Sequence, residues 1–183
     1  MRLAVWLAAG MAVWVVVLAL TACDPGDDVD VDPADATVRL EALRTEVREL
    51  VAGLATGAAA VLDGRVSDAT GHWEGCDSVF PEGHRSFRYR GSARVEAGPA
   101  AARPYLEALG RALDEVGLTD ATPGERPGGR TLGGTRGEVE VRWSELPGQG
   151  DYVLLDASGP CVDVPEDERA EWEGRPDPTP IVD

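Results

Sequence analysis

The spacing of apolar residues along the chain predicts two amphipathic helices. Between Thr37 and about residue 60, apolar side chains recur at steps of three and four, and charged side chains fill the positions between them. The apolar positions of this segment are Leu40, Leu43, Val47, Leu50 and Leu54. A second segment with this period starts at Pro99, whose fixed φ suits a first helical position, and ends at Gly117. Its apolar positions are Ala102, Tyr105, Leu106, Leu109, Leu113 and Val116. Both patterns are typical of helices that bury one face.

An alternation of apolar and polar residues with a period of two predicts three strands. They cover residues 87–96, 138–143 and 152–157. Residues 161–164 are interpreted as a short fourth strand or as an extension of the third past a bulge. The segments 63–85 and 119–137 are rich in glycine and proline, and we interpret both as irregular connections.

The order of these elements, αβαββ, predicts an α+β fold. Each helix and each strand has one apolar face that needs a partner. The natural solution is a two-layer sandwich, with both helices packed on one face of a small, mostly antiparallel sheet. The side chains expected to be buried together are Leu43, Val47, Leu50, Leu106, Leu109 and Leu113.

The first 22 residues have the pattern of an export signal. Met1-Arg2 is followed by an apolar run to Leu20, which ends in the sequence Leu20-Thr21-Ala22-Cys23. Small residues before a cysteine resemble the lipobox of bacterial lipoproteins, in which the cysteine is acylated and becomes the first residue after cleavage. The alternative is an uncleaved transmembrane helix, because about 20 apolar residues can span a bilayer. Both interpretations place the rest of the chain outside the cytoplasm.

The composition divides the remaining chain into three parts. Residues 23–35 comprise the lipidated cysteine and an acidic tether with six aspartates. Residues 36–164 form the extracytoplasmic α+β domain. Residues 165–183 are dominated by proline, glutamate and aspartate, and we expect a disordered tail with at most one helical turn around Glu168 to Trp172.

The charge of the chain narrows its partners. The formal net charge is −16, which repels nucleic acid. The chain contains no lysine, so Schiff-base and P-loop lysine chemistry are excluded. A basic strip on the first predicted strand is the exception to the acidic character, and we interpret it as a possible surface for an anionic partner. Its arginines are Arg85, Arg88, Arg90 and Arg94. The alternative is that Glu138 and Glu140 on a neighbouring strand neutralise it.

Two cysteines besides Cys23 predict a disulfide. Outside the cytoplasm thiols oxidise, so Cys76 and Cys161 are expected to be bridged. A metal site made of His72, Cys76 and His84 is the weaker interpretation, because zinc requires three or four such ligands and the bridge removes one. The glycine-rich residues 128–134 lead into a strand and are interpreted as a mobile loop. No catalytic residue, metal site or cofactor is predicted.

The order of these features resembles the LppA-type family of actinobacterial lipoproteins. The resemblance rests on the lipobox at Cys23, a first helix, a tryptophan-containing loop leading to Cys76, a strand, a second helix and a hairpin ending in Asp156-Ala157-Ser158-Gly159-Pro160-Cys161 before a proline-rich tail. It implies a small secreted lipoprotein, and it carries no catalytic residue over to this chain.

We therefore expect a lipoprotein anchored in the cell membrane through lipid on Cys23, on the extracytoplasmic face. Its expected role is to bind an unknown protein or another component of the envelope. A carrier of lipid or another apolar ligand is one alternative, which requires an enclosed apolar cavity of about 300 Å³ or more between sheet and helices. A hydrolase-type envelope enzyme is the other, and it requires His72 or His84 to meet a carboxylate or a serine.

Overall fold

The computed structural model describes residues 33–76, 83–113, 118–126, 129–146, 148–175 and 178–182, although the side chains of 33–34, 111–113, 119–121 and 126 are excepted. The export signal, Cys23 and residues 24–32 of the acidic tether lie outside these residues, whereas residues 33–35, expected to belong to the tether, form the start of the first helix. None of the helices in the described ranges combines the length and the apolar character that crossing a bilayer needs.

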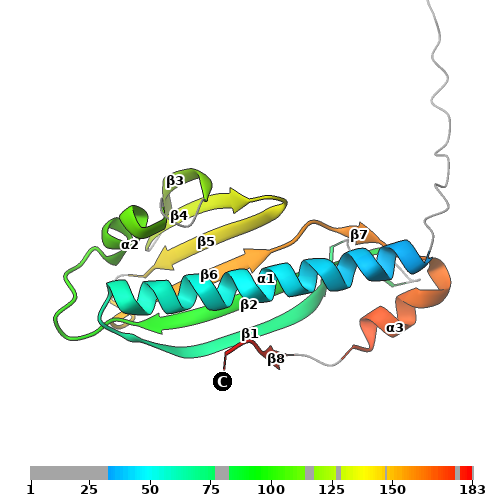
Figure 1. Ribbon diagram of the computed structural model, residues 1–183, viewed down its shortest axis with the longest axis horizontal. Coiled ribbons are helices and arrows are strands. Elements are labelled where there is room, and N and C mark those ends of the chain that lie inside the picture. Colours follow the sequence, from blue (N-terminus) through cyan, green and yellow to red (C-terminus); the bar gives the residue numbers. More distant parts are fainter. Residues whose placement is uncertain are drawn as a thin grey trace, which may run out of the picture.

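The long helix α1 (Pro33–Val61) lies across one face of a sheet (Figure 1). Its buried residues repeat every three or four positions, as the sequence predicts, and run from Ala36 to Ala58. The helix starts four residues before Thr37, the predicted start. It ends where Asp63 adopts a positive φ of 45°, a left-handed conformation that reverses the chain toward the sheet.

Eight strands form one sheet in the order β3-β4-β5-β6-β2-β1-β8, with β7 paired to β2. The strands are β1 (Arg65–Gly75), β2 (Ser86–Glu96), β3 (Thr119–Arg126), β4 (Gly129–Arg136), β5 (Val139–Glu145), β6 (Tyr152–Ser158), β7 (Val162–Asp163) and β8 (Thr179–Pro180). Neighbouring strands pair in the antiparallel direction. The mixed α+β class and the mostly antiparallel sheet are confirmed.

The predicted order αβαββ is not the order observed, because two segments interpreted as irregular connections contain strands. β1 pairs with β2 along its length, and β3 and β4 form a hairpin within residues 119–137. Among the described side chains of these strands few are buried: Ala69 of β1 and Leu132 of β4. Because backbone groups make the ladder, such strands form without a clear apolar–polar alternation. The loop expected at 128–134 is therefore largely strand β4.

Helix α2 (Tyr105–Leu113) begins six residues after Pro99, the start predicted for a helix that would end at Gly117. Pro104 has no amide hydrogen for the backbone bond that a helix from Pro99 would need there, so the helix begins after it. Glu145 of β5, only 3% exposed, accepts a hydrogen bond from the backbone nitrogen of Leu106 at 3.3 Å, in the first turn of the helix. Residues 114–117 and the side chain of Leu113 lie outside the described residues.

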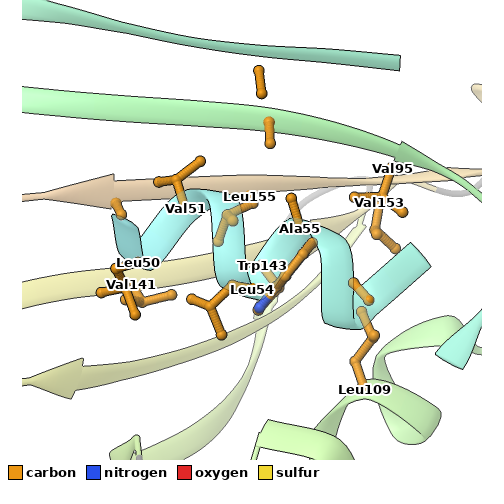
Figure 2. Close-up of a cluster of buried hydrophobic side chains, with 14 of the residues drawn as sticks. Leu50, Val51, Leu54, Ala55, Val95, Leu109, Val141, Trp143, Val153 and Leu155 are labelled. Atoms are coloured by element: carbon orange, nitrogen blue, oxygen red, sulfur yellow. The ribbon is translucent and has the colours of Figure 1, made fainter. Parts of the chain in front are cut away.

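One hydrophobic cluster joins both helices to the sheet (Figure 2). Leu54 and Ala55 of α1 and Leu109 of α2 pack with Trp143 and Leu155 from the sheet. Val47, Leu50, Leu106 and Leu109 belong to this cluster, as predicted. Leu43 is also buried, but in a second cluster whose other members are Ala36, Leu40, Phe87, Val162, Val164 and Trp172.

The C-terminal residues, expected to be disordered, fold back onto the domain. The segment contains a 3-10 turn, η2 (Glu166–Glu168), the helix α3 (Arg169–Glu173) and the strand β8. The helical turn expected near Trp172 is present. The Trp172 side chain is 2% exposed, and its ring centroid lies 4.8 Å from that of Trp73 on β1. Buried aromatic area, which composition does not reveal, holds this acidic segment in place.

The predicted disulfide between Cys76 and Cys161 is confirmed. Their Cα atoms are 6.1 Å apart, and the bond joins the end of β1 to the start of β7. Because Val162 and Val164 are buried directly after Cys161, the bridge ties the β1 end to the second hydrophobic cluster.

Candidate interaction surface

The sheet turns one face toward α1 and presents the other to solvent. Along β2, β5 and β6 the buried side chains alternate with half-exposed or exposed ones, so the second set lies on the opposite face. We call this second set the outer face. It comprises His72 and Glu74 of β1, Arg88, Arg90, Ser92 and Arg94 of β2, Glu140, Arg142 and Ser144 of β5, and Tyr152, Leu154, Asp156 and Ser158 of β6.

Two shallow hollows lie on the outer face and share Asp156. One, of about 250 Å³, is lined by residues that include Arg88, Arg90, Arg142 and Ser158. The other, of about 270 Å³, is lined by residues that include Asp68, Ser92, Arg94 and Leu154. The strand register explains why they adjoin, because Ser92 of β2 and Arg142 of β5 both face Asp156 of β6.

Three of the four arginines of the predicted basic strip lie on the outer face, and the exposed Arg85 precedes β2. Arg88 donates to Glu74 through Nε at 2.9 Å. Arg90 donates to Asp156 at 3.1 Å and lies 3.7 Å from Glu74. Half-exposed pairs of this kind are worth about 0.2–1 kcal/mol each. The strip is therefore partly neutralised.

The neutralising residues differ from those expected. Glu138 pairs instead with Arg39 of α1, at 3.2 Å. Glu140 lines the first hollow but has no ion pair within the described residues. The reason is topological: β6 lies between β2 and β5, so Asp156, not Glu140, is the direct neighbour of the strip.

Two guanidinium groups on the outer face form no ion pair with a carboxylate of the described residues. Arg94 lies 3.9 Å from the ring centroid of Tyr152, an attractive cation–π geometry. Arg142 is exposed on β5 and lines the first hollow. Reading β2 alone identified Arg94, but Arg142 joins it only through the pairing of β5 with β6.

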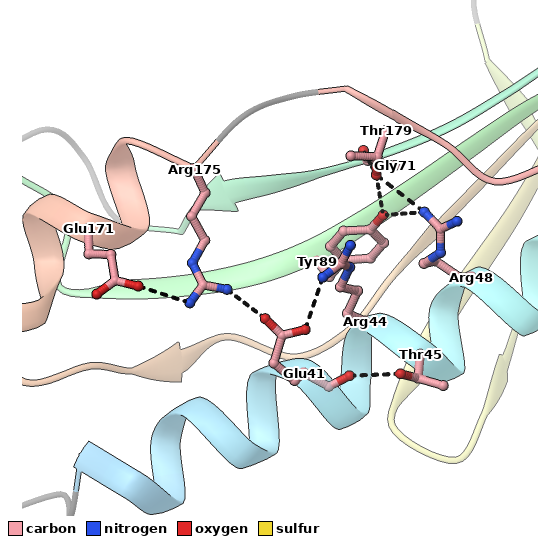
Figure 3. Close-up of polar contacts among 9 residues, drawn as sticks. All are labelled: Glu41, Arg44, Thr45, Arg48, Gly71, Tyr89, Glu171, Arg175 and Thr179. Atoms are coloured by element: carbon pink, nitrogen blue, oxygen red, sulfur yellow. Dashed lines mark hydrogen bonds and ion pairs between the residues drawn. The ribbon is translucent and has the colours of Figure 1, made fainter.

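A second polar site holds the C-terminal strand against β1 (Figure 3). Arg48 of α1 donates to the carbonyl oxygen of Pro180 at 2.7 Å and to Oγ1 of Thr179 at 3.2 Å. The Thr179 hydroxyl lies 3.3 Å from the Tyr89 hydroxyl and donates to the carbonyl oxygen of Gly71 at 3.3 Å. These residues sit on four separate elements, so no local sequence signal identified them.

A cluster of ion pairs around Arg175, next to this site, links α3 to α1. Arg175 pairs with Glu41 at 2.6 Å and with Glu171 at 3.3 Å, and its guanidinium lies 3.4 Å from the ring centroid of Trp172. Glu41 also accepts a hydrogen bond from Arg44, which raises the pKa of that arginine. The cluster connects α1, the first described element, to the residue that follows α3 and Gly174.

The two histidines lie apart in the fold. His72 is on the outer face opposite Arg90. His84 precedes β2, where its backbone nitrogen donates to Glu173 at 2.8 Å and its buried Nδ1 has no partner among the described residues. Neither imidazole is hydrogen-bonded to a carboxylate or serine within the described ranges. In the same ranges no three histidine, cysteine, aspartate or glutamate residues are grouped as metal ligands.

An apolar cleft opens between α2 and the β3–β4 hairpin. Its volume is about 500 Å³, and its lining includes Leu106, Gly110, Pro123 and Leu132. The space between α1 and the sheet, by contrast, is filled by the side chains of the hydrophobic cluster.

Comparison of the chain with known proteins finds no matching family model, no matching curated protein and no matching solved structure.

Proposed function

We propose that this chain is a lipid-anchored lipoprotein of the bacterial envelope whose domain binds a partner through its outer face. The export signal, the lipobox ending at Cys23 and the resemblance to LppA-type lipoproteins support the anchor. A disulfide between Cys76 and Cys161 is consistent with an oxidising compartment outside the cytoplasm.

The observation that supports the binding role is that helices cover only one face of the sheet. In this proposal the domain is a two-layer sandwich, which the cluster joining Leu54, Leu109 and Leu155 supports. The helices cover the apolar face and leave a charged face with two hollows. Arg94 and Arg142 form no ion pair within the described part of the chain, although a hydrogen bond from Arg65 and then the charge of Arg94 lower the pKa of Glu96. They are therefore the groups that a ligand would engage.

The chemistry of these two residues defines the partner. A planar guanidinium donates paired hydrogen bonds that match a carboxylate or phosphate. We therefore propose an envelope protein that presents acidic groups to the outer face. Since the whole chain carries a charge of −16, recognition depends on these local contacts and not on long-range attraction.

The tether limits where binding takes place. Nine residues lie between Cys23 and Pro33, the first residue of α1, so the two are ten positions apart. A chain of this length spans at most about 35 Å. The proposed partner is therefore within reach of the membrane surface.

Site-specific crosslinking in intact envelopes tests the proposal. A photoreactive residue at position 92, on the outer face, should give a discrete protein adduct. The same residue at position 38, where Val38 on α1 is 68% exposed, should not. The double substitution Arg94→Gln and Arg142→Gln should remove the adduct, because it removes both unpaired guanidiniums.

The matched control is Arg136→Gln, a change at an exposed arginine that shares the strand parity of the buried Leu132 and so lies on the other face. It should leave the adduct intact. Adducts of equal intensity from positions 92 and 38, or an adduct insensitive to the double substitution, would refute the outer face as the binding surface.

A second candidate function rests on the cleft beside α2. Its volume of about 500 Å³ suits a small ligand whose apolar body contacts the leucine and proline side chains of the lining, beside Glu107, Glu125 and Arg130. A Cβ at Gly110 would lie 3.7 Å from Leu132, so Gly110→Leu should fill the cleft without disrupting α2. Native mass spectrometry of protein purified from envelopes should show a bound apolar molecule that Gly110→Leu removes. A ligand-free wild-type protein contradicts the carrier function.

A further inference from the structure

We propose that the groove holding the C-terminal strand is a binding site for an extended peptide segment of a partner protein, with the pattern hydroxyl residue, proline, aliphatic residue. In this structure the chain's own Thr179, Pro180 and Ile181 occupy it. The site is separate from the outer face and does not depend on the proposed function.

The polar part of the groove recognises backbone and a hydroxyl group. Arg48 donates to the Pro180 carbonyl. The Thr179 hydroxyl lies between the Tyr89 hydroxyl and the Gly71 carbonyl, and it contacts both. The Ile181 backbone nitrogen donates to the carbonyl oxygen of Ala69 at 2.8 Å. Pro180 contributes only its carbonyl to these contacts, so its missing N–H leaves no bond unmade.

The apolar part of the groove is a socket created by a glycine. A Cβ at Gly91 would lie 3.2 Å from the Ile181 side chain, 3.2 Å from Val47 and 2.9 Å from Val51. Any larger residue there would take the space that Ile181 uses. Ile181 accordingly packs against the main hydrophobic cluster.

A second glycine makes room for the polar clamp. A Cβ at Gly71 would lie 2.2 Å from the Tyr89 hydroxyl. Without a side chain at this position, the phenol reaches the edge of β1, where it meets Thr179. The two glycines thus shape a hydroxyl site and an aliphatic site two residues apart.

The groove is part of the core, whereas the occupant adds one short strand to its edge. β8 pairs with β1 at Thr70 and Gly71, and the Ile181 amide adds a bond to Ala69, while β1 is paired with β2 along its length. Arg48 and Tyr89 belong to α1 and β2, so they stay in place when β8 leaves. An exposed strand edge with side-chain pockets is the geometry by which extended peptides add a strand to a sheet.

Peptide binding to the full chain tests this inference. The probe is a fluorescent peptide with the sequence of residues 178–182. The receptor carries Thr179→Ala and Ile181→Ser, which weaken the seating of its own tail. Fluorescence anisotropy should show binding at least 10-fold tighter than to the wild-type chain, whose own tail competes.

Variants of the clamp separate recognition from nonspecific adhesion. Adding Arg48→Gln to this receptor should weaken binding at least 10-fold, whereas Arg39→Gln on the same helix should not change it. Absence of binding to the receptor, or binding unaffected by Arg48→Gln, overturns the proposal. A wild-type dimer that the peptide dissociates would make a second copy the occupant and also overturn it.

Hydrogen exchange on the wild-type chain provides a test without substitutions. If β8 opens while the sheet stays folded, the amide of Ile181 should exchange at least 100-fold faster than the amides that join β1 to β2. Equal protection of the two sets would show that β8 leaves only on global unfolding, which contradicts a replaceable occupant.

Discussion

Arg103 links the start of α2 to the β5–β6 turn. Its guanidinium lies 3.1 Å from Asp151 and 3.3 Å from the buried Glu145, and it also donates to the Gly150 carbonyl. Hydrogen bonds from Arg103 and then from Tyr105 lower the pKa of Asp151. The residue that positions α2 therefore also determines the titration of a turn carboxylate.

This link predicts a pH effect that one substitution reduces. A carboxylate with a lowered pKa stabilises the fold above its ordinary pKa, and the stabilisation is lost as the pH falls through the lowered folded value. Arg103→Gln should raise the pKa of Asp151 toward the ordinary value of about 3.9. Carbon-detected NMR titration measures this change. Arg65→Gln is the control, since Arg65 pairs with Glu96 and should leave Asp151 unchanged.

The disulfide is predicted to be a main source of stability. Replacing both Cys76 and Cys161 by alanine should lower the free energy of unfolding by about 2–5 kcal/mol, because the bridge closes a loop over a sequence separation of 85 residues. Urea denaturation of the double variant against wild type gives the value. An unchanged denaturation midpoint, or free thiols at both positions in the native protein, would contradict the prediction.

At the scale of elements, α3 illustrates how a short helix is stabilised by what it contacts. It has five residues and no side-chain cap, so it would not persist alone. Trp172 inserts between Trp73 and Phe87, and Arg175 covers its ring. The acidic residues that suggested disorder are the exposed residues of this segment, and they surround one buried tryptophan.

Trp172→Ala should therefore destabilise the whole domain and not only its tail. Removal of a buried tryptophan costs about 3–5 kcal/mol. Thermal denaturation followed by circular dichroism measures the change. Asp167→Ala, at an exposed position of η2, serves as the control and should stay within about 0.5 kcal/mol of wild type. A tail that contributes nothing to the core would give equal melting temperatures for the two variants.

At the scale of the whole molecule, the segment that contains α3 returns to the beginning of α1. α3 packs beside the beginning of α1, while α2 lies near the other end of that helix (Figure 1). Arg175 of the C-terminal part pairs with Glu41 of α1. In the proposed lipoprotein, the tether would therefore leave the domain at the end where α3 lies, and the α2 cleft would lie toward the opposite end.

The anchor itself is tested by Cys23→Ser. This variant should lose its lipid and leave the membrane fraction, since acylation requires the thiol. Cell fractionation measures the distribution, and mass spectrometry of the wild-type protein should find a lipid-modified Cys23 as the first residue. Cys76→Ser, which retains the lipobox, should remain in the membrane fraction. A mature wild-type protein that still begins at Met1 would contradict cleavage.

The sequence by itself determined α1, the strands β2, β5 and β6, and the pairing of Cys76 with Cys161. In these elements the apolar residues repeat with the period of the structure that buries them, which is a local property. The same alternation placed Arg88, Arg90 and Arg94 on one face. With Cys23 assigned to the lipobox, only Cys76 and Cys161 remained, so only one disulfide could be predicted.

Only the tertiary structure decided which strands are neighbours and where the tail goes. β1, β3 and β4 are held largely by backbone hydrogen bonds, which any residue can supply, so their side chains gave little signal. Asp156 pairs with Arg90 because β6 is the direct neighbour of β2 in the sheet. Arg48 donates a hydrogen bond to Thr179 across a sequence separation of 131 residues. Such contacts depend on the path of the whole chain, because their energy comes from groups that local sequence does not bring together.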